Sequence, residues 1–106
     1  MYFHHPDLAY SPVEIIGGVY DHTATKGEAA RLECVADGNP PPQYTWKKDG
    51  QVIVLRDRYT LVAGGSLRIE RVDIPDEGKY ECEAKNNGGV KRSHGYLKVR
   101  GKVLYF

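Results

Sequence analysis

The sequence predicts an all-β fold, a sandwich of two antiparallel sheets. Three observations lead to this fold class. Apolar and polar residues alternate in short segments, turn residues separate these segments, and four residues have the spacing of a pinned sandwich core. Trp46 lies twelve positions after Cys34, and Tyr80 lies two positions before Cys82. No segment shows a convincing 3.6-residue period, so we expect no layer of helices.

The first expected strand covers residues 12–16, where Pro12 suits the start of an edge strand. Gly17-Gly18 then lets the chain kink or cross between sheets. Residues 19–25 continue along an edge, and residues 26–28 form a turn.

Residues 30–36 alternate with a period of two, which is the pattern of a half-buried strand. The residues expected to face inward are Ala30, Leu32, Cys34 and Ala36. The stretch 37–42 ends in three prolines, which lack three backbone donors, so we expect a loop without regular structure. One of its X-Pro bonds is a candidate for the cis isomer.

In the middle of the chain, Tyr44 and Trp46 are expected to point inward from one strand. Residues 48–51 form a hairpin turn with Asp-Gly at its centre. Short strands follow at residues 52–55 and 59–62, and residues 63–65 turn the chain.

The last third continues the pattern. We expect Leu67 and Ile69 to face inward from a strand, and Val72 and Ile74 to close the bottom of the core. The hairpin signal at residues 86–89, Asn-Asn-Gly-Gly, is the strongest in the chain. The two strands that flank it bury alternate residues: Tyr80, Cys82 and Ala84 before it, and Leu97 and Val99 after it.

Length and composition fit one soluble domain. The chain has 106 residues, of which 41% are apolar and 27% charged, and its formal net charge is +1. A domain of this size buries roughly two-thirds of its unfolded surface, so one core suffices. The balanced charge gives no global attraction to nucleic acid, and no apolar run approaches the roughly 20 residues that cross a bilayer. We therefore expect neither nucleic-acid binding nor direct membrane insertion.

We place one domain at residues 12–100, with tails at 1–11 and 101–106. Residues 1–6 lack the basic start and apolar stretch of a signal peptide, so an extracellular protein would supply this chain as part of a longer one. The apolar residues 103–106 are a linker, an engineered remnant or the start of a neighbouring domain.

The two cysteines are too few for a structural zinc site without histidines, and one long-range bridge is their simplest use. In a chain-entropy model, closing a loop of about 47 residues stabilises the fold by roughly 4 kcal/mol. Such a bridge persists in an oxidising compartment.

Over residues 12–100 the chain resembles an immunoglobulin domain of the intermediate set, or I-set. The resemblance rests on these motifs: Gly27-Glu28, Leu32-Glu33-Cys34, Gly38 to Pro42, Trp46 to Gly50, Leu67-Arg68-Ile69, Asp76 to Ala84, and Asn86. The short spacing from Trp46 to Leu67 leaves little room for the extra strand of variable-type domains.

The resemblance implies the roles of the core residues. Cys34 and Cys82 would form one disulfide between the two sheets, with Trp46 packed on it. The Tyr80 hydroxyl would bond the backbone of the turn at residues 73–78. Arg58 and Asp76 would form an ion pair, and Leu32 and Leu67 would complete the core.

The resemblance also implies a non-catalytic function. I-set domains occur mainly in multi-domain cell-surface receptors and adhesion proteins, where they recognise proteins or act as spacers. The expected partner is a protein ligand or another copy of an immunoglobulin-domain protein, in homophilic contact. The alternative is a cytoplasmic module of a sarcomeric or cytoskeletal scaffold. A cysteine pair favours the extracellular role, whereas the lack of an Asn-x-Ser/Thr site mildly favours the intracellular one.

Catalysis, cofactor binding and metal binding have little support. The four histidines lie in no catalytic motif, and Ser66 and Ser93 have no nearby base in the sequence. His4-His5 with Asp7 resembles a surface chelate, but a disordered tail or tag remnant is the simpler interpretation. We expect no enzyme, no cofactor and no metal site.

Three groups of residues are candidates for contact: a basic stretch, four tyrosines and the apolar tails. Six of the fifteen basic residues lie between positions 85 and 102, a stretch without Asp or Glu. These six residues are Lys85, Lys91, Arg92, Lys98, Arg100 and Lys102. Their charge suggests contact with a heparan-sulfate-like glycan, phospholipid headgroups or an acidic protein. The alternative is that this strand is an edge strand, which carries lysine to prevent unwanted pairing, and that Glu81 and Glu83 on the neighbouring strand neutralise the basic residues.

Tyr10, Tyr20, Tyr59 and Tyr96 are candidates either for hot spots of a protein interface or for packing within the domain. The apolar tails, at Tyr2-Phe3 and residues 103–106, are candidates for edge pairing or contact with another copy.

Overall fold

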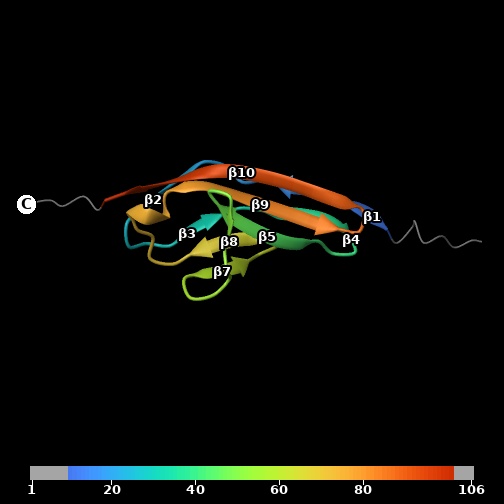
Figure 1. The fold of residues 1–106 in the computed structure, drawn as a ribbon, viewed down its shortest axis with the longest axis horizontal. Helices are drawn as coiled ribbons and strands as arrows, with labels where there is room; N and C mark the ends of the chain where they lie inside the picture. Colours follow the sequence, from blue (N-terminus) through green and yellow to red (C-terminus); the bar gives the residue numbers. More distant parts are fainter. Residues whose placement is uncertain (1–9, 102–106) are drawn as a thin grey trace, which may run out of the picture.

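The computed structural model describes residues 10–101, and the tails at 1–9 and 102–106 lie outside the described residues. Within the described range the chain forms ten strands and one short 3₁₀ helix (Figure 1). The first six strands are β1 (Ser11–Gly17), β2 (His22–Thr25), β3 (Ala30–Leu32), β4 (Val35–Asn39), β5 (Gln43–Lys48) and β6 (Gln51–Val52). They are followed by β7 (Tyr59–Val62), β8 (Ser66–Ile69), the helix η2 (Ile74–Asp76), β9 (Gly78–Asn86) and β10 (Gly89–Arg100).

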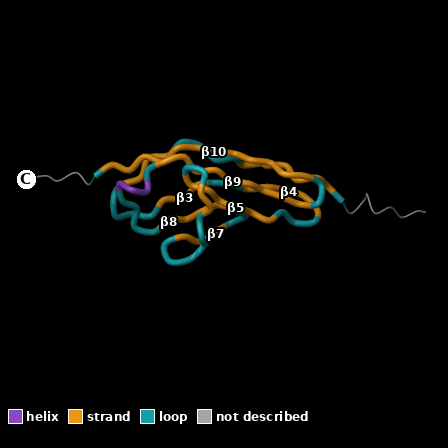
Figure 2. The backbone as a smooth tube through the Cα atoms, viewed as in Figure 1, coloured by secondary structure: helices purple, strands orange, loops and turns teal. Residues whose placement is uncertain are grey.

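The strands build an immunoglobulin-like sandwich of two layers (Figures 1 and 2). One layer is a five-stranded sheet in the order β2-β10-β9-β5-β6. The other holds the three-stranded sheet β3-β8-β7 and the pair β1-β4. The expected all-β sandwich is confirmed. One detail of the expectation is wrong, because β2 runs parallel to β10 and the five-stranded sheet is therefore mixed.

The chain changes layers between β1 and β2, as the glycine pair predicts. β1 pairs with β4 in one layer, and β2 pairs with β10 in the other. At the crossing, the Val19 N–H donates to the Ser93 hydroxyl over 2.9 Å. A Cβ on Gly18 would lie 2.7 Å from that same oxygen, so a larger residue here would displace the Ser93 hydroxyl from this bond.

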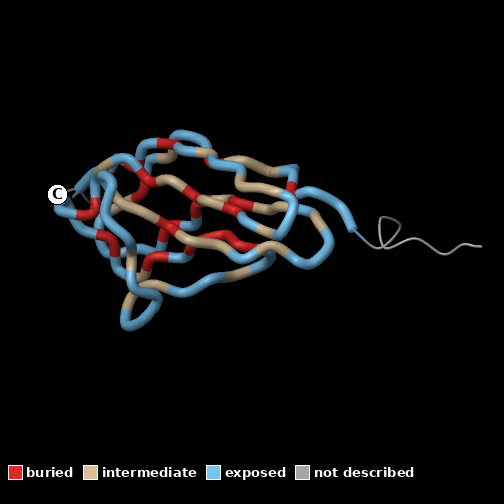
Figure 3. The backbone as a smooth tube through the Cα atoms, turned by 45° about the vertical axis from the view of Figure 1, so that its right-hand side comes forward, coloured by how far each residue is buried: buried red, intermediate tan, exposed pale blue. Residues whose placement is uncertain are grey.

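The core lies between the layers and is drawn in red in Figure 3. Cys34 and Cys82 form the expected disulfide, with 6.4 Å between their Cα atoms. Trp46 lies opposite Cys82 in the β5–β9 register, and its indole N–H donates to the Gly65 carbonyl over 2.7 Å. The aliphatic residues that are at most 2% exposed and cluster with Trp46 are Ala30, Leu32, Leu67, Ile69, Val72 and Leu97.

The strand expected at residues 30–36 alternates as predicted from Ala30 to Cys34 and then changes partner, and Ala36, expected to face inward, is only half-buried, like Val35. β3 pairs with β8, whereas β4 pairs with β1. Between them the Cys34 N–H donates to the buried Ser66 hydroxyl over 3.0 Å, and the Cys34 carbonyl accepts from the Gly65 N–H. A side-chain hydroxyl thus takes the place of one ladder bond.

Three expectations about local structure are wrong. Residues 37–39 are strand rather than loop, because β4 runs to Asn39 and only the three prolines leave the ladder. A residue before proline favours extended backbone, which explains why Asn39 continues the strand. The Asn39–Pro40 bond is the cis one.

The strand expected at residues 52–55 is shorter. The Asp49-Gly50 turn forms with both residues at positive φ, as in a type I′ hairpin. β6 then covers only Gln51–Val52. The last backbone bond to β5 is the one that the Ile53 N–H donates to the Trp46 carbonyl. The chain then turns away, because the Arg56 N–H donates to the Val54 carbonyl in a tight turn.

The third wrong expectation concerns the bottom of the core. Val72 is buried, but Ile74 is 48% exposed. The Asp73 carboxylate accepts a hydrogen bond from the Ile74 N–H and caps η2, so Ile74 begins a helical turn whose first side chain points outward. Period-two reasoning cannot anticipate this change of backbone.

Candidate functional site

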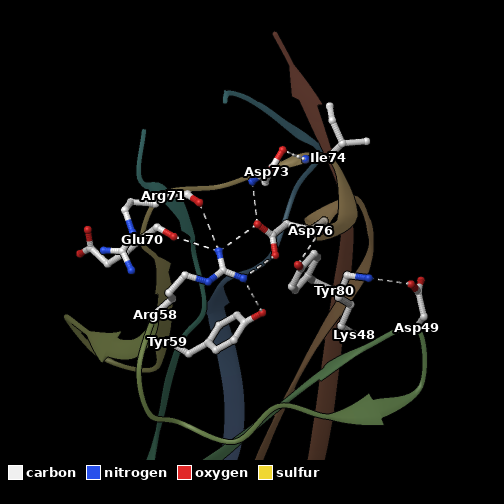
Figure 4. Close-up of polar contacts among 10 residues, drawn as sticks. All are labelled: Lys48, Asp49, Arg58, Tyr59, Glu70, Arg71, Asp73, Ile74, Asp76 and Tyr80. Atoms are coloured by element: carbon white, nitrogen blue, oxygen red, sulfur yellow. Dashed lines mark hydrogen bonds and ion pairs between the residues drawn. The ribbon is translucent and has the colours of Figure 1, made fainter. Parts of the chain in front are cut away.

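A polar network fastens the corner between β8 and β9 (Figure 4). The Arg58 guanidinium donates to both oxygens of Asp76, over 3.0 and 2.9 Å. It also donates to the Glu70 carbonyl over 3.0 Å and lies 5.4 Å from the centre of the Tyr59 ring. The Asp76 carboxylate is only 7% exposed, so this ion pair forms largely out of water.

The environment of this corner shifts two pKa values. Burial disfavours the Asp76 anion, but hydrogen bonds from Arg58 and from the Asp73 N–H outweigh it and hold the Asp76 pKa below its usual value. Burial raises the pKa of Tyr80, whose hydroxyl donates to the Asp76 carbonyl over 2.6 Å. Every group in the network is used by the fold, so the corner positions strands and offers no free acid or base.

The five-stranded sheet turns one side away from the core. We call it the outer face and define it by the residues of β10, β9 and β5 that alternate with buried ones: Arg92, His94, Tyr96, Lys98, Arg100, Lys79, Glu81, Glu83, Lys85, Thr45 and Lys47. Register sets them in rows across the sheet. His94, Glu81 and Lys47 form one row, and Arg92, Glu83 and Thr45 form the next.

Tyr96 is the exposed aromatic residue of the outer face, at 51%. The His94 ring packs edge-on against it, with 6.0 Å between ring centres. The Tyr96 N–H donates to the Asp21 carboxylate over 2.9 Å, and Lys79 lies opposite Tyr96 in the β9–β10 register. The ring therefore stands on a backbone held from both sides.

The predicted basic contact residues fall into two groups, those that contact an acidic side chain and those that do not. Lys91 and Arg92 point to opposite sides of β10, because Lys91 lies opposite the buried Ala84 and Arg92 opposite Glu83. The Lys91 ammonium contacts Glu14 at 3.1 Å, and Arg92 contacts Glu83 at 3.2 Å. The predicted neutralisation of Arg92 by Glu83 thus occurs.

Lys98 and Arg100 do share the outer face. The Arg100 Nε donates to the Thr25 hydroxyl over 3.2 Å, and Lys98 lies opposite Thr23. Neither contact involves an acid. β2 covers β10 along residues 97–100, so the alternative of an edge strand is wrong there and holds only for the preceding part of β10. Lys85 is exposed opposite Gln43, at the far end of the face.

The tyrosines predicted as contact residues differ in how far they are exposed. Tyr20 is 61% exposed and Tyr10 is 41% exposed, whereas Tyr59 packs against the core. Lys102, the His4-His5 and Asp7 group, Tyr2-Phe3 and residues 103–106 lie outside the described residues. Within residues 10–101, no three His, Cys, Asp or Glu side chains are grouped to hold a metal ion. The described residues also include no helix that is long and apolar enough to span a membrane.

The sequence places Asn86 in a turn and among the I-set motifs, but it does not predict the contacts that this residue makes. The Asn86 amide donates to the Ser11 and Pro40 carbonyls over 2.8 and 3.2 Å. Its oxygen accepts from the Val13 and Gly88 N–H groups. Asn86 thereby ties β1 and the proline loop to the β9–β10 hairpin. An asparagine just before a Gly-rich hairpin was the signal available in the sequence, but it indicates the turn and not its distant partners.

Comparison with known proteins agrees with this architecture. The model of the immunoglobulin I-set domain matches residues 13–99. Human leucine-rich repeats and immunoglobulin-like domains protein 3 is 44% identical over 80 residues, which cover 74% of this chain and 7% of that protein. Among solved structures, titin domain M7 is 32% identical with a TM-score of 0.79, covering 86% of this chain and 96% of that one.

A second structure, of tandem immunoglobulin repeats of Dlar, is 32% identical with a TM-score of 0.81, over 87% of this chain and 50% of that one. The relatives by sequence are mostly extracellular or cell-surface proteins, whereas titin is intracellular. This chain spans between 2% and 8% of the length of the curated relatives it matches. The fold, the core residues and the match over residues 13–99 together establish that the chain belongs to the immunoglobulin I-set domain family.

Proposed function

We propose that this domain is a non-catalytic protein-recognition module of an extracellular protein, and that it binds its partner through the outer face. The observation that carries the proposal is Tyr96, a large aromatic ring half exposed on a rigid sheet. Tyrosine is enriched at interface hot spots, because its ring buries much area at little entropic cost. His94 and the Asp21 contact hold the ring in place before binding, which lowers the cost of association.

The charges around Tyr96 suit a protein partner better than a purely acidic one. Along β9, Glu81 and Glu83 lie between Lys79 and Lys85, and across the sheet Glu81 lies opposite Lys47 and Glu83 opposite Arg92. A surface with both positive and negative side chains favours a partner whose charges are opposite at each position. A partner that brings like charges together is repelled.

The Cys34–Cys82 disulfide supports the extracellular setting, because a buried bridge of this kind persists in oxidising compartments. The extracellular or cell-surface relatives support it as well. The alternative is an intracellular scaffold module, and the similarity to titin domains favours this alternative. The domain also serves as a spacer in either setting, since strands run its whole length.

The test is the binding of fluorescent tetramers of the domain to intact cultured mouse and human cells. Tyr96→Ala should weaken binding about 30-fold, the loss of roughly 2 kcal/mol that defines a hot spot. Ile16→Ala is the matched control, because Ile16 is 69% exposed on β1 in the other layer and should bind like the wild type.

Protease treatment of the cells should abolish binding, and heparinase treatment should leave it unchanged. If Tyr96→Ala binds as tightly as the wild type, the outer face is not the recognition surface. If wild-type tetramers bind no cell, the spacer role replaces recognition.

A second candidate is binding of a heparan-sulfate-like glycan at the end of the outer face. Lys98 and Arg100 favour it, because they are exposed, lie two residues apart on one face, and contact no acid among the described residues. Lys91 and Arg92 are poor candidates because Glu14 and Glu83 already neutralise them.

A heparin column distinguishes these groups. Lys98→Ala with Arg100→Ala should lower the salt concentration of elution, while Lys91→Ala should change it little. Elution of the wild type at low salt would exclude the glycan.

A further inference from the structure

The loop between β6 and β7 carries an exposed arginine. Residues 53–58 lie outside the strands, and this loop projects beside β7 (Figure 1). The Arg56 side chain is 76% exposed and that of Asp57 is 84% exposed. Val54 and Leu55, which precede them, are 61% and 43% exposed. Exposed loop tips are the places where a protease most readily reaches a folded chain.

The middle of this loop is held by backbone bonds within itself. The Arg56 N–H donates to the Val54 carbonyl over 2.9 Å, and the Arg56 carbonyl accepts from the Tyr59 N–H over 3.0 Å. Both bonds are local, so both break when only this loop opens. On either side, Ile53 and Arg58 are fixed by backbone bonds to other segments. Opening a short exposed loop in this way costs far less free energy than unfolding the domain.

Other basic residues are tied more firmly into the fold. Within residues 10–101, the basic residues outside the strands are Lys26, Arg56, Arg58 and Arg71. The Lys26 N–H donates to the last residue of β10, and the Arg58 side chain is bound by Asp76. The residue after Arg71 donates its N–H to the Glu28 carbonyl. Of these four basic residues, Arg56 is the one whose bonds all stay within residues 54–59.

We propose that the Arg56–Asp57 peptide bond is a cleavage site for proteases with an acidic specificity pocket, the kind of pocket that binds an arginine side chain. Arg56 fills this pocket, and Leu55 and Val54 contact the neighbouring subsites. The Arg56 guanidinium contacts Asp57 at 3.8 Å, and this pair offers little resistance because ion pairs between exposed side chains are weak.

The reaction is hydrolysis, with water as the second reactant. The water oxygen bonds to the Arg56 carbonyl carbon, and the bond from this carbon to the Asp57 nitrogen breaks. The two protons of the water molecule pass to that nitrogen. The products are a carboxylate at Arg56 and an ammonium group at Asp57.

The cut domain stays in one piece. The cleaved bond lies between Cys34 and Cys82, so the disulfide links the two fragments. β5 on the first fragment pairs with β9 on the second, and β3 on the first pairs with β8 on the second. The cut therefore leaves the core and the outer face in place, and this inference does not depend on the proposed function of the outer face.

The experiment is limited proteolysis of the oxidised domain with trypsin, followed by mass spectrometry and by electrophoresis with and without reductant. The first cut within residues 10–101 should follow Arg56. The cut protein should give one band without reductant and two fragments with it, the first of which ends at Arg56. A cut after Lys102 removes only residues 103–106 and is distinguished by its mass.

Arg56→Gln should slow this cut at least about a hundredfold, because a pocket built to bind a charged group rejects a side chain that lacks it. Arg71→Gln is the matched control, because Arg71 is also exposed outside the strands. This control should be cut after Arg56 at the rate of the wild type.

Three results would overturn the proposal. The first is a folded domain that resists trypsin at amounts that digest the reduced and unfolded chain, and the second is a first cut elsewhere in residues 10–101. The third is an Arg56→Gln variant that is cut in this loop as fast as the wild type. Two separate bands without reductant would refute the joined product. Tyr96→Ala should be cut like the wild type, which separates this test from that of the outer face.

Discussion

Replacing Asp76 by asparagine should destabilise the domain by about 2–3 kcal/mol. The carboxylate accepts two charge-assisted bonds from Arg58 and one from the Asp73 N–H. Asparagine keeps the shape but has one acceptor oxygen, and its amide would face a guanidinium that only donates. Removing one partner of a buried pair costs about 3–5 kcal/mol. Arg58 is 30% exposed and keeps its bond to the Glu70 carbonyl, so we expect a loss at or below the lower end of that range, about 2–3 kcal/mol.

The pH dependence follows from the direction of the Asp76 pKa. Burial alone would raise this pKa, but the bonds from Arg58 and from the Asp73 N–H lower it below the unfolded value. A carboxyl with a depressed folded pKa stabilises the fold above its unfolded pKa of about 4, and this contribution disappears as the pH falls through the folded pKa. The difference between wild type and Asp76→Asn should therefore be constant from about pH 5 to 8 and shrink below about pH 4.

Urea denaturation of both proteins at neutral and acid pH measures this difference in the free energy of unfolding. In thermal denaturation at neutral pH, the melting temperature of the variant should be roughly 10–20 °C lower than that of the wild type. Asp57→Asn is the control, because the Asp57 side chain is 84% exposed and contacts Arg56 only at 3.8 Å. Asparagine also tolerates its positive φ. A loss below 0.5 kcal/mol for Asp76→Asn, on the order of a surface change, would refute the reasoning. An equal difference at neutral and acid pH would refute the electrostatic part.

Three further predictions concern the core. Trp46→Ala should lower the free energy of unfolding by about 3–5 kcal/mol in urea denaturation, because Trp46 is 1% exposed and its indole N–H donates to the Gly65 carbonyl. A loss under about 1 kcal/mol would mean that burial of Trp46 on the disulfide does not stabilise the fold. Tyr80→Phe should cost about 1–2 kcal/mol, since a buried carbonyl loses its donor, and an unchanged midpoint would contradict this. Protein from its native compartment should show no free thiol after unfolding, and reducing Cys34–Cys82 should lower stability by about 4 kcal/mol in the chain-entropy model; two reactive thiols would exclude the extracellular setting.

The sequence predicts the core of this domain well because the core is periodic. Inward residues alternate on straight strands, and their identity follows from spacing alone, as for Leu67, Ile69 and Cys82. Ile74 departs from this rule because Asp73 caps a helical turn. The short β6 has a similar cause, since a turn after Val54 ends the ladder although the side chains still favour a strand.

The surface is harder to predict because it depends on pairing between distant segments. Lys91 and Arg92 are adjacent in sequence, yet β10 sends them to opposite sides, to Glu14 and Glu83. The edge status of β10 also changes along its length, since β2 covers only its last residues. Neither fact follows from local composition.

The crossing between β1 and β2 has a consequence for a chain under tension. The described chain begins near β1 at one end of the sandwich and leaves β10 at the other (Figure 1). Pulling the two ends apart would slide β2 along its parallel partner β10. The four paired positions from Leu97–His22 to Arg100–Thr25 would then share the load and not open one after another. A domain tethered at both ends in a longer chain would thus resist force along its length through the parallel pair of β2 and β10.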